Sequence, residues 1–351
     1  MINLKNFYAE PPSSVCLLRL SALGDICNVL PVVRAIQECW PNTTLSWVIG
    51  KEAYPLVEME SGIDFIVLDK SQSVFDHRKR LVGQSFDILL NLHPTMRANL
   101  ISYFIKAKIK LGFDRKRSKD FHHFFCTHQI PYTEKEHVVD GFLSFLKTLG
   151  FPAIAPRWDL LLVKNKSIIN YLSQEKLNVM ISPCSSERLH NFRNWSVENY
   201  IDLIKALQDK HQAHIVLTGG NSATDQCYSE LLEKSNLSIT NLIGKTTIHE
   251  LTSIIAESDL VVCPDSGPTH IANALNTPVV TLFATSNKAR TGPYRFLDHC
   301  ADQYENNLKA YLNKSIDEVR WGARIRVADA MDSIVVSEVL EKIDILIREK
   351  S

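Results

Sequence analysis

Residues 260–275 read Leu-Val-Val-Cys-Pro-Asp265-Ser-Gly267-Pro268-Thr-His270-Ile-Ala-Asn-Ala-Leu. An apolar run ends just before Asp265, and a helical pattern begins just after His270. The stretch therefore predicts a buried strand, a tight turn and the start of a helix. Gly267 lets a ligand approach the backbone closely, and Pro268 suits a first helical turn. Such a helix start attracts phosphate; an ordinary capped helix is the alternative that the stretch leaves open.

The same alternation of apolar runs and helical patterns surrounds this stretch in the second half of the chain. Strands that alternate with helices indicate a parallel sheet covered by helices on both faces. In such sheets ligands lie beyond the carboxyl ends of the strands. The strands are expected at 179–182, 214–218, 238–243 and 279–283, and the helices include 198–208 and 248–257.

The first half repeats the pattern, with apolar runs at 15–20, 45–49, 65–68 and 86–92. Asp25 follows the first run and a glycine, where it could serve as a general base or simply cap a helix. No Gly-x-Gly-x-x-Gly motif follows that run, and the chain has no Gly-x-x-x-x-Gly-Lys-Ser/Thr P-loop. A dinucleotide-dependent dehydrogenase and a P-loop ATPase are therefore disfavoured.

The length of 351 residues favours two domains. We expect an α/β protein of two Rossmann-like domains with parallel sheets that face each other across a cleft. The predicted division is a first domain at 1–160, a connection at 161–178, a second domain at 179–330, and a C-terminal helix at 331–351. We expect that helix to pack back toward the first domain.

Residues 97–123 form a long, one-sided basic stretch. It contains eight Lys and Arg residues against two Asp residues, with phenylalanines interleaved. A nucleic-acid groove, a surface for a phosphorylated or carboxylated lipid, and a solvated basic face would all look like this.

The bulk composition excludes several other classes. The formal net charge is zero, so the molecule as a whole is not a binder of polyanions. None of the eight cysteines forms a Cys-x-x-Cys pair, which indicates free thiols in a reducing compartment. The N-terminus has no apolar core of a signal peptide, and no apolar run approaches the length of a membrane span. A cytoplasmic protein is expected.

Four segments together resemble a known family. They are Leu20-Ser-Ala-Leu-Gly-Asp25; Ser185-Ser186 followed by Arg193-Asn-Trp195; Asn241-Leu-Ile-Gly-Lys245; and Asp265-Ser-Gly-Pro-Thr-His270. In order and spacing the chain resembles the ADP-heptose–lipopolysaccharide heptosyltransferases of glycosyltransferase family 9, which have the GT-B fold. The first segment leans toward the enzymes that add the first heptose.

The resemblance implies a role for each matching residue. Asp25 would be the catalytic base, and the second domain would bind the donor. Arg193 stands where the family usually has a lysine, and the two serines stand where it usually has threonines. A glutamate that some members have after Gly219-Gly220 is missing here, with only Asp225 nearby. The implied donor residues are Ser185, Ser186, Arg193, Thr246, Asp265, Ser266, Gly267 and His270, and the implied acceptor residues of the first domain are Ser21, Arg97, Arg115, Arg117 and Lys119.

The resemblance also implies the partners. The donor would be ADP-heptose, a nucleotide-diphosphate sugar, and the acceptor Kdo-lipid A or inner-core lipopolysaccharide. The protein would work peripherally on the cytoplasmic face of the inner membrane, without a cofactor and without nucleic acid. The chain has no Asp-x-Asp, so we expect inverting transfer that is independent of metal. Two other hypotheses remain: an enzyme acting on another nucleotide sugar (a transferase, an epimerase or a hydrolase), and a non-catalytic protein that binds acidic glycolipid.

Overall fold

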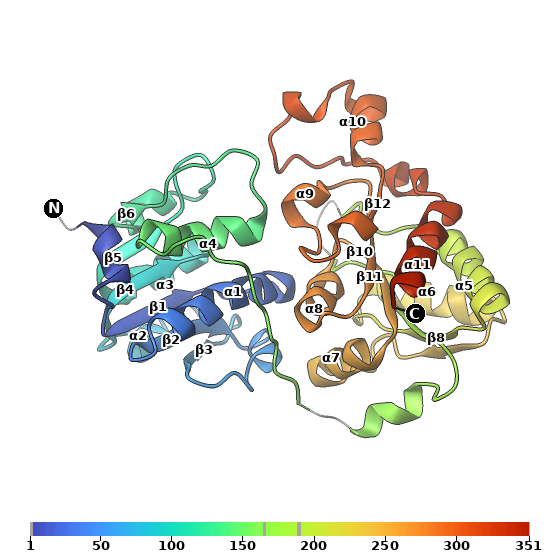
Figure 1. Ribbon diagram of the computed structural model, residues 1–351, viewed down its shortest axis with the longest axis horizontal. Helices are drawn as coiled ribbons and strands as arrows, with labels where there is room; N and C mark the ends of the chain where they lie inside the picture. Colours follow the sequence, from blue (N-terminus) through green and yellow to red (C-terminus); the bar gives the residue numbers. More distant parts are fainter. Residues whose placement is uncertain (1–2, 164–165, 188–190, 351) are drawn as a thin grey trace. The chain divides into compact units, whose positions relative to one another are not determined.

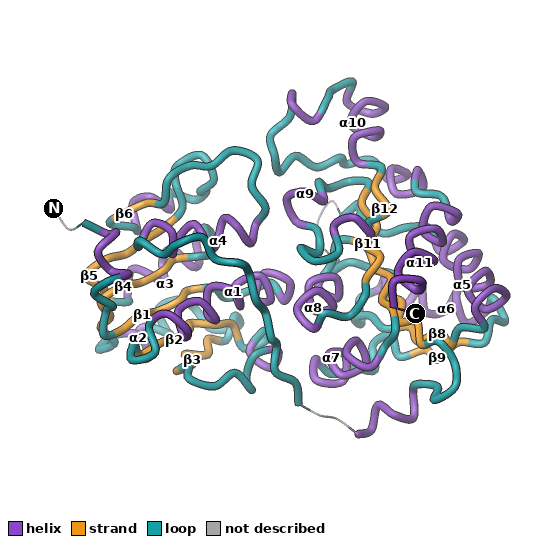
Figure 2. The backbone as a smooth tube through the Cα atoms, viewed as in Figure 1, coloured by secondary structure: helices purple, strands orange, loops and turns teal. Residues whose placement is uncertain are grey.

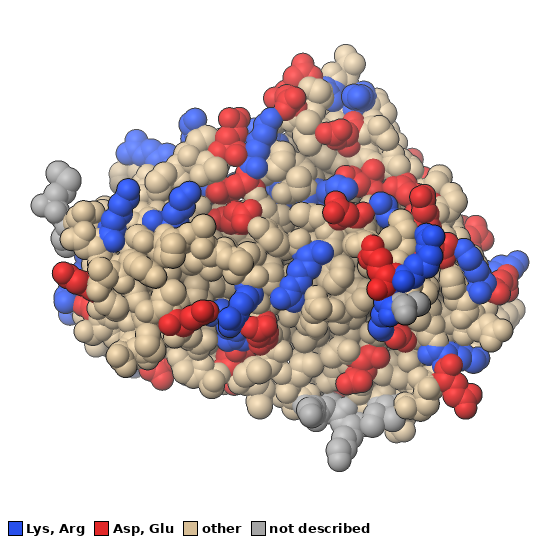
Figure 3. Space-filling model, in the orientation of Figure 1, with Lys and Arg blue, Asp and Glu red and all other residues tan. Residues whose placement is uncertain are grey.

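The computed structural model describes residues 3–163, 166–187 and 191–350. The chain divides into two compact units, Met1–Leu161 and Leu162–Ser351. Figure 1 colours the first unit blue to green and the second yellow-green to red. In both units the strands, orange in Figure 2, alternate with helices. The face drawn in Figure 3 carries basic and acidic side chains interspersed, in keeping with the zero net charge.

The first unit is built on a six-stranded sheet in which every paired strand is parallel. The strand order is β3-β2-β1-β4-β5-β6. The order reverses between β1 and β4, so their carboxyl ends flank the crevice in which such sheets bind ligands. The strands are β1 (Ser14–Leu18), β2 (Thr44–Gly50), β3 (Asp64–Leu68), β4 (Ser85–Asn91), β5 (Lys106–Gly112) and β6 (His128–Gln129), and the helices are α1 (Leu23–Cys39), α2 (Arg78–Leu81), α3 (Met96–Phe104) and α4 (Val138–Thr148).

Alternating side chains of β1 point to one face of this sheet, where helices cover them. Cys16 and Leu18 pack into a cluster with Leu81 of α2 and Ile101 of α3. Helices α1 and α4 pack against each other. α1 begins at Leu23 and continues through Pro31, so Asp25 stands in its first turn.

The second unit repeats the architecture with the order β12-β11-β10-β7-β8-β9, again parallel throughout. Here the order reverses between β7 and β10. Two parallel sheets with intervening helices confirm the expected α/β class. The strands are β7 (Asn178–Ile181), β8 (His214–Leu217), β9 (Ile239–Asn241), β10 (Leu260–Pro264), β11 (Val279–Phe283) and β12 (Ala301–Asp302), and the helices are α5 (Val197–His211), α6 (Ala223–Lys234), α7 (Ile248–Glu257), α8 (Gly267–Leu275), α9 (Lys288–Thr291), α10 (Tyr304–Leu312) and α11 (Val336–Lys350).

The C-terminal helix belongs to the core of the second unit. α11 contacts α5 and β11, and Val339, Ile343 and Leu346 lie in that core. Its apolar stripe thus covers the sheet beside β11, and the expected packing toward the first domain stays a prediction. The segment expected as a connection also belongs to the second unit, where the 3-10 helix Lys166–Tyr171 contacts α7.

The basic stretch 97–123 is divided among several elements. Arg97 lies on α3, the lysines at 106, 108 and 110 lie on β5, and residues 113–121 form the loop beyond the carboxyl end of β5. We did not expect a strand here. β5 is about 20 Å long. Lys106 therefore lies at the amino ends of the strands, and Lys119 lies beyond their carboxyl ends.

The eight cysteines are free thiols in the structure, as expected. Among the described residues, no helix is both long enough and apolar enough to cross a membrane.

Candidate active site

Asp25 lies beyond the carboxyl end of β1, at the point where the strand order of the first sheet reverses. Its carboxylate accepts a hydrogen bond from the backbone N–H of Ala22, at 3.4 Å, and so closes the first turn of α1. The side chain remains about one-third exposed. Asp25 thus caps its helix and also presents a carboxylate where a ligand of this fold would lie.

Arg19 fixes the position of the Asp25 carboxylate through an ion pair. Its guanidinium makes an ion pair with the Asp25 carboxylate. The same group donates to the carbonyl oxygens of Ser21, at 2.8 Å, and Leu92, at 2.6 Å. It also lies over the ring of Phe142, 5.5 Å from its centroid. With only 8% of the residue exposed, Arg19 is a fixed positive charge that ties the ends of β1 and β4 together beside Asp25.

His93 follows β4 and completes this cluster. Its Nδ1 accepts a hydrogen bond from the backbone N–H of Leu20, at 3.2 Å. Burial, and after it the positive charge of Arg19, lowers the pKa of His93 to about 3, although Asp25 acts in the opposite direction. His93 is therefore a neutral imidazole near pH 7.

Two of the cations predicted for the acceptor are used to hold the fold. Arg97 donates to the backbone carbonyls of Asp69, Lys70 and Gln72, at 2.9–3.2 Å. Arg117 pairs with the carboxylates of Asp114 and Glu136, and donates to the carbonyl of Pro131 at 2.7 Å. Two carboxylates neutralise Arg117, so it is not a spare charge for a ligand.

Arg115 and Lys119 differ from these two. Both side chains are exposed, and neither makes an ion pair within the part of the chain that the structure describes. They lie in the loop beyond the carboxyl end of β5, which neighbours β4. Ser21, the fifth predicted acceptor residue, is exposed beside Asp25. Geometry therefore favours Ser21, Arg115 and Lys119 over Arg97 and Arg117, and all five roles stay predictions.

A buried polar network fixes the loop that carries these cations. The Asn99 side chain on α3 donates to the carbonyl of Asp120 at 2.9 Å. His122 contacts Asn99 through Nδ1, at 2.7 Å, and accepts from the N–H of Phe113 through Nε2, at 3.1 Å. Burial lowers the pKa of His122 to about 4, with a smaller contribution from His123.

The second unit places Asp265 beyond the carboxyl end of β10, again where the strand order reverses. Ser266 follows in extended conformation as the N-cap of α8, and its hydroxyl makes no capping bond to that helix. Gly267 begins α8, and His270 is buried in the first turns of the helix. The sequence prediction of a strand, a tight turn and a helix start is thus confirmed at this site.

Arg193 joins the loop after β7 to Asp265. Its guanidinium donates to the carbonyl of Asp265 at 2.7 Å and lies 3.8 Å from the Asp265 carboxylate. The Ser286 hydroxyl, beyond the carboxyl end of β11, donates to the same carboxylate at 2.8 Å. Both charged side chains are about nine-tenths buried, so the geometry of the pair is well defined.

The loop that carries Arg193 is held at both ends. Ser185 donates through its N–H and its hydroxyl to the side chain of Asn194, at 2.9 and 3.0 Å. Trp195 is fully buried, and its indole donates to the carbonyl of Ile334 at 3.0 Å. Ser185 is itself buried and committed to these bonds, whereas Ser186 is exposed in the loop.

Thr246 and Asp225 lie farther along this sheet. Thr246 is half-buried between the edge strand β9 and the start of α7. Asp225 accepts from the N–H and the hydroxyl of Ser222, at 3.1 and 2.6 Å, and so caps α6. Its carboxylate lies against Gly219 and Gly220, where an added Cβ would come within about 3 Å. Its first role is therefore to close the turn after β8.

Sequence reasoning assigned no role to Arg19, His93, Ser286 or Asn194. All four follow directly on a strand end or belong to a predicted loop, so the rule that ligands lie beyond carboxyl ends could have flagged His93 and Ser286. Nothing local marks Arg19, because its partner carbonyl at Leu92 lies 73 residues away.

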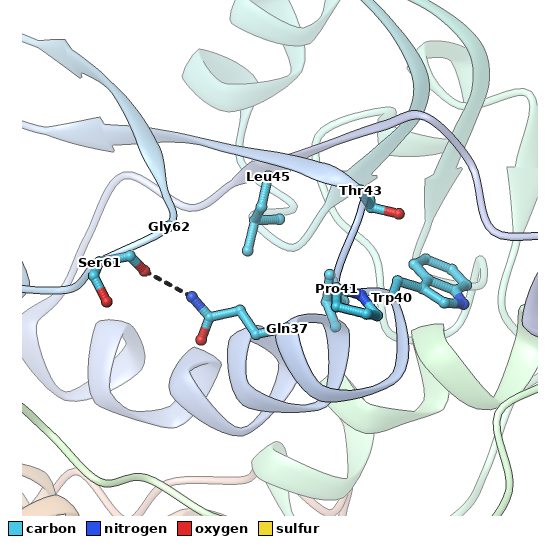
Figure 4. Close-up of a pocket in the computed structure, with 8 residues that line it drawn as sticks. Gln37, Trp40, Pro41, Thr43, Leu45, Ser61 and Gly62 are labelled. Atoms are coloured by element: carbon cyan, nitrogen blue, oxygen red, sulfur yellow. Dashed lines mark hydrogen bonds between the residues drawn. The ribbon is translucent and has the colours of Figure 1, made fainter.

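The pocket drawn in Figure 4 lies elsewhere. It has a volume of about 270 Å³, is lined by Gln37, Trp40 and Leu45, and is closed on one side by the bond from Gln37 to the carbonyl of Ser61. Gln37 stands at the opposite end of α1 from Asp25, about 18 Å along the helix. Among the described residues, no group of three or more His, Cys, Asp or Glu is arranged to hold a metal ion.

Comparison with known proteins gives consistent results. The profile of glycosyltransferase family 9 (heptosyltransferase) matches residues 74–317. The chain is 34% identical to the lipopolysaccharide core heptosyltransferase OpsX of Haemophilus influenzae, over 95% of this chain and 96% of that protein. A family 9 glycosyltransferase structure from Veillonella parvula superposes with a TM-score of 0.76 at 19% identity, covering 96% of this chain and 97% of that one. Escherichia coli heptosyltransferase WaaC with ADP gives a TM-score of 0.71 at 15% identity, covering 95% and 99%.

Proposed function

Because this chain belongs to glycosyltransferase family 9, the heptosyltransferases, we propose that it transfers heptose from ADP-heptose to the inner core of lipopolysaccharide. The observation that carries the proposal is the cluster of Arg193, Asp265 and Ser286 at the start of α8. OpsX, the relative from Haemophilus influenzae, is itself named as a lipopolysaccharide core heptosyltransferase.

The donor binds to the second unit. Negative charge grows on the ADP diphosphate as the bond to the sugar breaks. The buried Arg193 and the N–H groups at the start of α8 supply the compensating positive charge. Ser266, Gly267 and His270 lie at the same helix start, while Ser185 and Ser186 follow the neighbouring strand β7. Asp265 accepts hydrogen bonds from hydroxyl groups of the heptose, and Thr246 lies toward the nucleoside.

The acceptor binds to the first unit, where Asp25 takes the proton of the attacking hydroxyl. A single in-line displacement then inverts the anomeric carbon. Arg19 holds the carboxylate in place, and the exposed Arg115 and Lys119 meet the Kdo carboxylates and phosphates of the acceptor. Asp25 thus supplies the base, and Arg193 with the start of α8 supplies the positive charge for the leaving group. The transfer therefore needs no metal ion and proceeds without one.

The natural acceptor is Kdo-lipid A or a longer inner core, and the protein works at the cytoplasmic face of the inner membrane. The support is chemical, since an acceptor with acyl chains is held in a bilayer and the donor is soluble. The motif at 20–25 favours addition of the first heptose.

The test is to incubate the purified protein with a panel of nucleotide sugars, with Kdo-lipid A and with heptosyl-Kdo-lipid A, and to identify the products by mass. The expected result is one added heptose, from ADP-heptose, on Kdo-lipid A. Asp25→Asn, which keeps the acceptor atom of the helix cap, lowers kcat by roughly 10²–10⁴-fold.

Other results would overturn the proposal. Turnover of donor without acceptor would indicate a hydrolase or an epimerase. Binding of the acceptor with no transfer from any sugar nucleotide would indicate a glycolipid-binding protein. Full activity in Asp25→Asn would remove the aspartate from the role of base.

A further inference from the structure

The outward side of α3 is unusual for a surface helix. Its sequence, Met96 to Phe104, contains one charged residue, Arg97. The guanidinium of Arg97 donates its hydrogen bonds to backbone carbonyls. Met96, Leu100 and Tyr103 recur at helical spacing and are 40%, 38% and 71% exposed. The opposite side is buried through Ala98 and Ile101. α3 is therefore apolar on its solvent side as well as on its core side, whereas a surface helix normally turns polar residues to water.

Aromatic residues from two other segments extend this surface. Phe75, just before α2, contacts the ring of Phe104 at 6.0 Å between centroids and is 74% exposed. Phe121 and Phe124, at the 3-10 helix beside α3, contact each other at 6.3 Å and are 65% and 76% exposed. We call Phe75, Met96, Leu100, Tyr103, Phe121 and Phe124 the aromatic face.

The charge around the aromatic face has one dominant sign. Residues 74–125 contain eleven Lys and Arg against four Asp and Glu, although the whole chain is neutral. Exposed cations stand next to the face at Arg78 and Lys79 of α2, Lys106 after α3, and Lys119 before Phe121. Of the four acids, Asp87 pairs with Lys108 and Asp114 pairs with Arg117, while Asp76 and Asp120 are exposed next to Phe75 and Phe121. The surroundings of the face are therefore basic.

We propose that the aromatic face docks the protein onto a bilayer that contains anionic lipids. Exposed aromatic rings prefer the boundary between head groups and acyl chains, and adjacent lysines and arginines are drawn to the negative surface. Exposed apolar side chains gathered on neighbouring elements in this way mark an interaction site rather than ordinary protein surface. The basic surroundings favour an anionic partner. The exposed rings favour a lipid bilayer, because they can insert between its head groups.

This inference deepens the proposed function, on which it rests for the lipid nature of the acceptor. It assigns the attachment to particular residues of the first unit, the unit that carries Asp25. Arg115 and Lys119 lie in the loop that leads directly into Phe121. Docking through the aromatic face would therefore hold the acceptor-binding loop at the head-group layer.

The test is co-sedimentation with vesicles of phosphatidylcholine alone and of phosphatidylcholine with 30% phosphatidylglycerol. The protein is expected to pellet with the anionic vesicles, and binding should weaken as salt is raised. The triple variant F75S/Y103S/F124S should lower the apparent affinity by about tenfold or more. Y311S/L312S is the matched control, because Tyr311 and Leu312 of the second unit are each 42% exposed. The control should bind like the wild type.

A second measurement separates this inference from the proposed function. The triple variant should transfer heptose normally to a soluble, deacylated acceptor but more slowly to acceptor embedded in vesicles. Wild-type protein that ignores anionic vesicles, or a triple variant that binds them fully, would overturn the docking surface. So would a wild-type dimer that the triple variant dissociates in light scattering, because a second copy would then cover the face. Failure of the proposed function would show instead as no transfer to either acceptor by the wild type.

Discussion

Arg19 and Asp25 form an ion pair in which the Asp25 side chain is 36% exposed and the Arg19 side chain only 10%. The guanidinium is anchored to the backbone of Ser21 and Leu92, so its position is set by the ends of β1 and β4. Asp25 in turn closes the first turn of α1. The proposed base is therefore fixed from two sides, by a helix start and by a cation that belongs to the sheet.

Replacing Arg19 tests whether this fixation matters for turnover. Arg19→Gln removes the charge beside Asp25 and weakens the anchor to β4, so kcat should fall roughly 10–100-fold, the worth of one charge-assisted hydrogen bond. KM for ADP-heptose should change little, because the proposed donor site lies in the second unit. Arg19→Lys keeps the charge and should recover part of the loss. Steady-state kinetics with a thermal melt of each variant gives the answer, and an unchanged kcat in a folded Gln variant would show that Arg19 serves only the fold.

Arg193 is expected to act on the donor. Arg193→Gln removes the buried charge that the diphosphate would meet, and kcat/KM for ADP-heptose should fall roughly 10²–10³-fold. Arg193→Lys keeps the charge but not the two-pronged geometry and should lose less, about tenfold. Lys234→Gln, at an exposed cation of α6, is the control and should behave like the wild type. Equal losses for Gln and Lys would mean that the geometry at Asp265, not the charge, is what the enzyme needs.

His122 should make the protein less stable in mild acid. Its Nε2 accepts a hydrogen bond from Phe113, so a proton on that nitrogen would break the bond. The pKa of His122 is about 4 in the folded protein and about 6.5 when unfolded, so the unfolded chain binds more protons as the pH falls below 6.5. The contribution of His122 to the free energy of unfolding is thus fully present above pH 6.5 and is lost as the pH falls from 6.5 to 4. The loss from pH 7 to pH 5 should be about 1–2 kcal/mol.

Urea unfolding at pH 7 and pH 5 measures this dependence. In His122→Gln the total stability is lower, but the difference between the two pH values should shrink by about that amount. His123→Gln, at the half-buried neighbour, should leave the difference nearly unchanged. An identical pH dependence in the wild type and His122→Gln would place the titrating group elsewhere, with His93 the first alternative.

Removal of metal should leave transfer intact. In the proposed mechanism, Arg193 and the start of α8 meet the charge on the departing diphosphate, and the chain has no Asp-x-Asp to hold a bridging cation. Activity after dialysis against EDTA should match that of untreated enzyme, with or without added magnesium. Loss of activity in EDTA that magnesium or manganese restores would contradict the mechanism proposed above.

Much of the architecture follows from the sequence alone. Apolar runs predicted the strands that precede Asp25 and Asp265, and Gly267 with Pro268 predicted the start of the helix that follows Asp265. These features are local, because a strand or a helix start is encoded by neighbouring residues. The alternation of strands and helices then fixed the parallel class in both halves, and the spacing of four segments pointed to the family.

Tertiary structure alone decided which polar groups are available. Arg97 and Arg117 looked like part of one basic surface, yet each is bound to groups that only the folded chain brings near. Arg193 reaches Asp265 across 72 residues, and Arg19 reaches Leu92 across 73. Such partners depend on which strands lie side by side, and the order of strands in a sheet is set by packing of the whole unit. The sequence therefore predicted Asp25 and Asp265 as site residues, while the tertiary structure determined which side chains hold them in place.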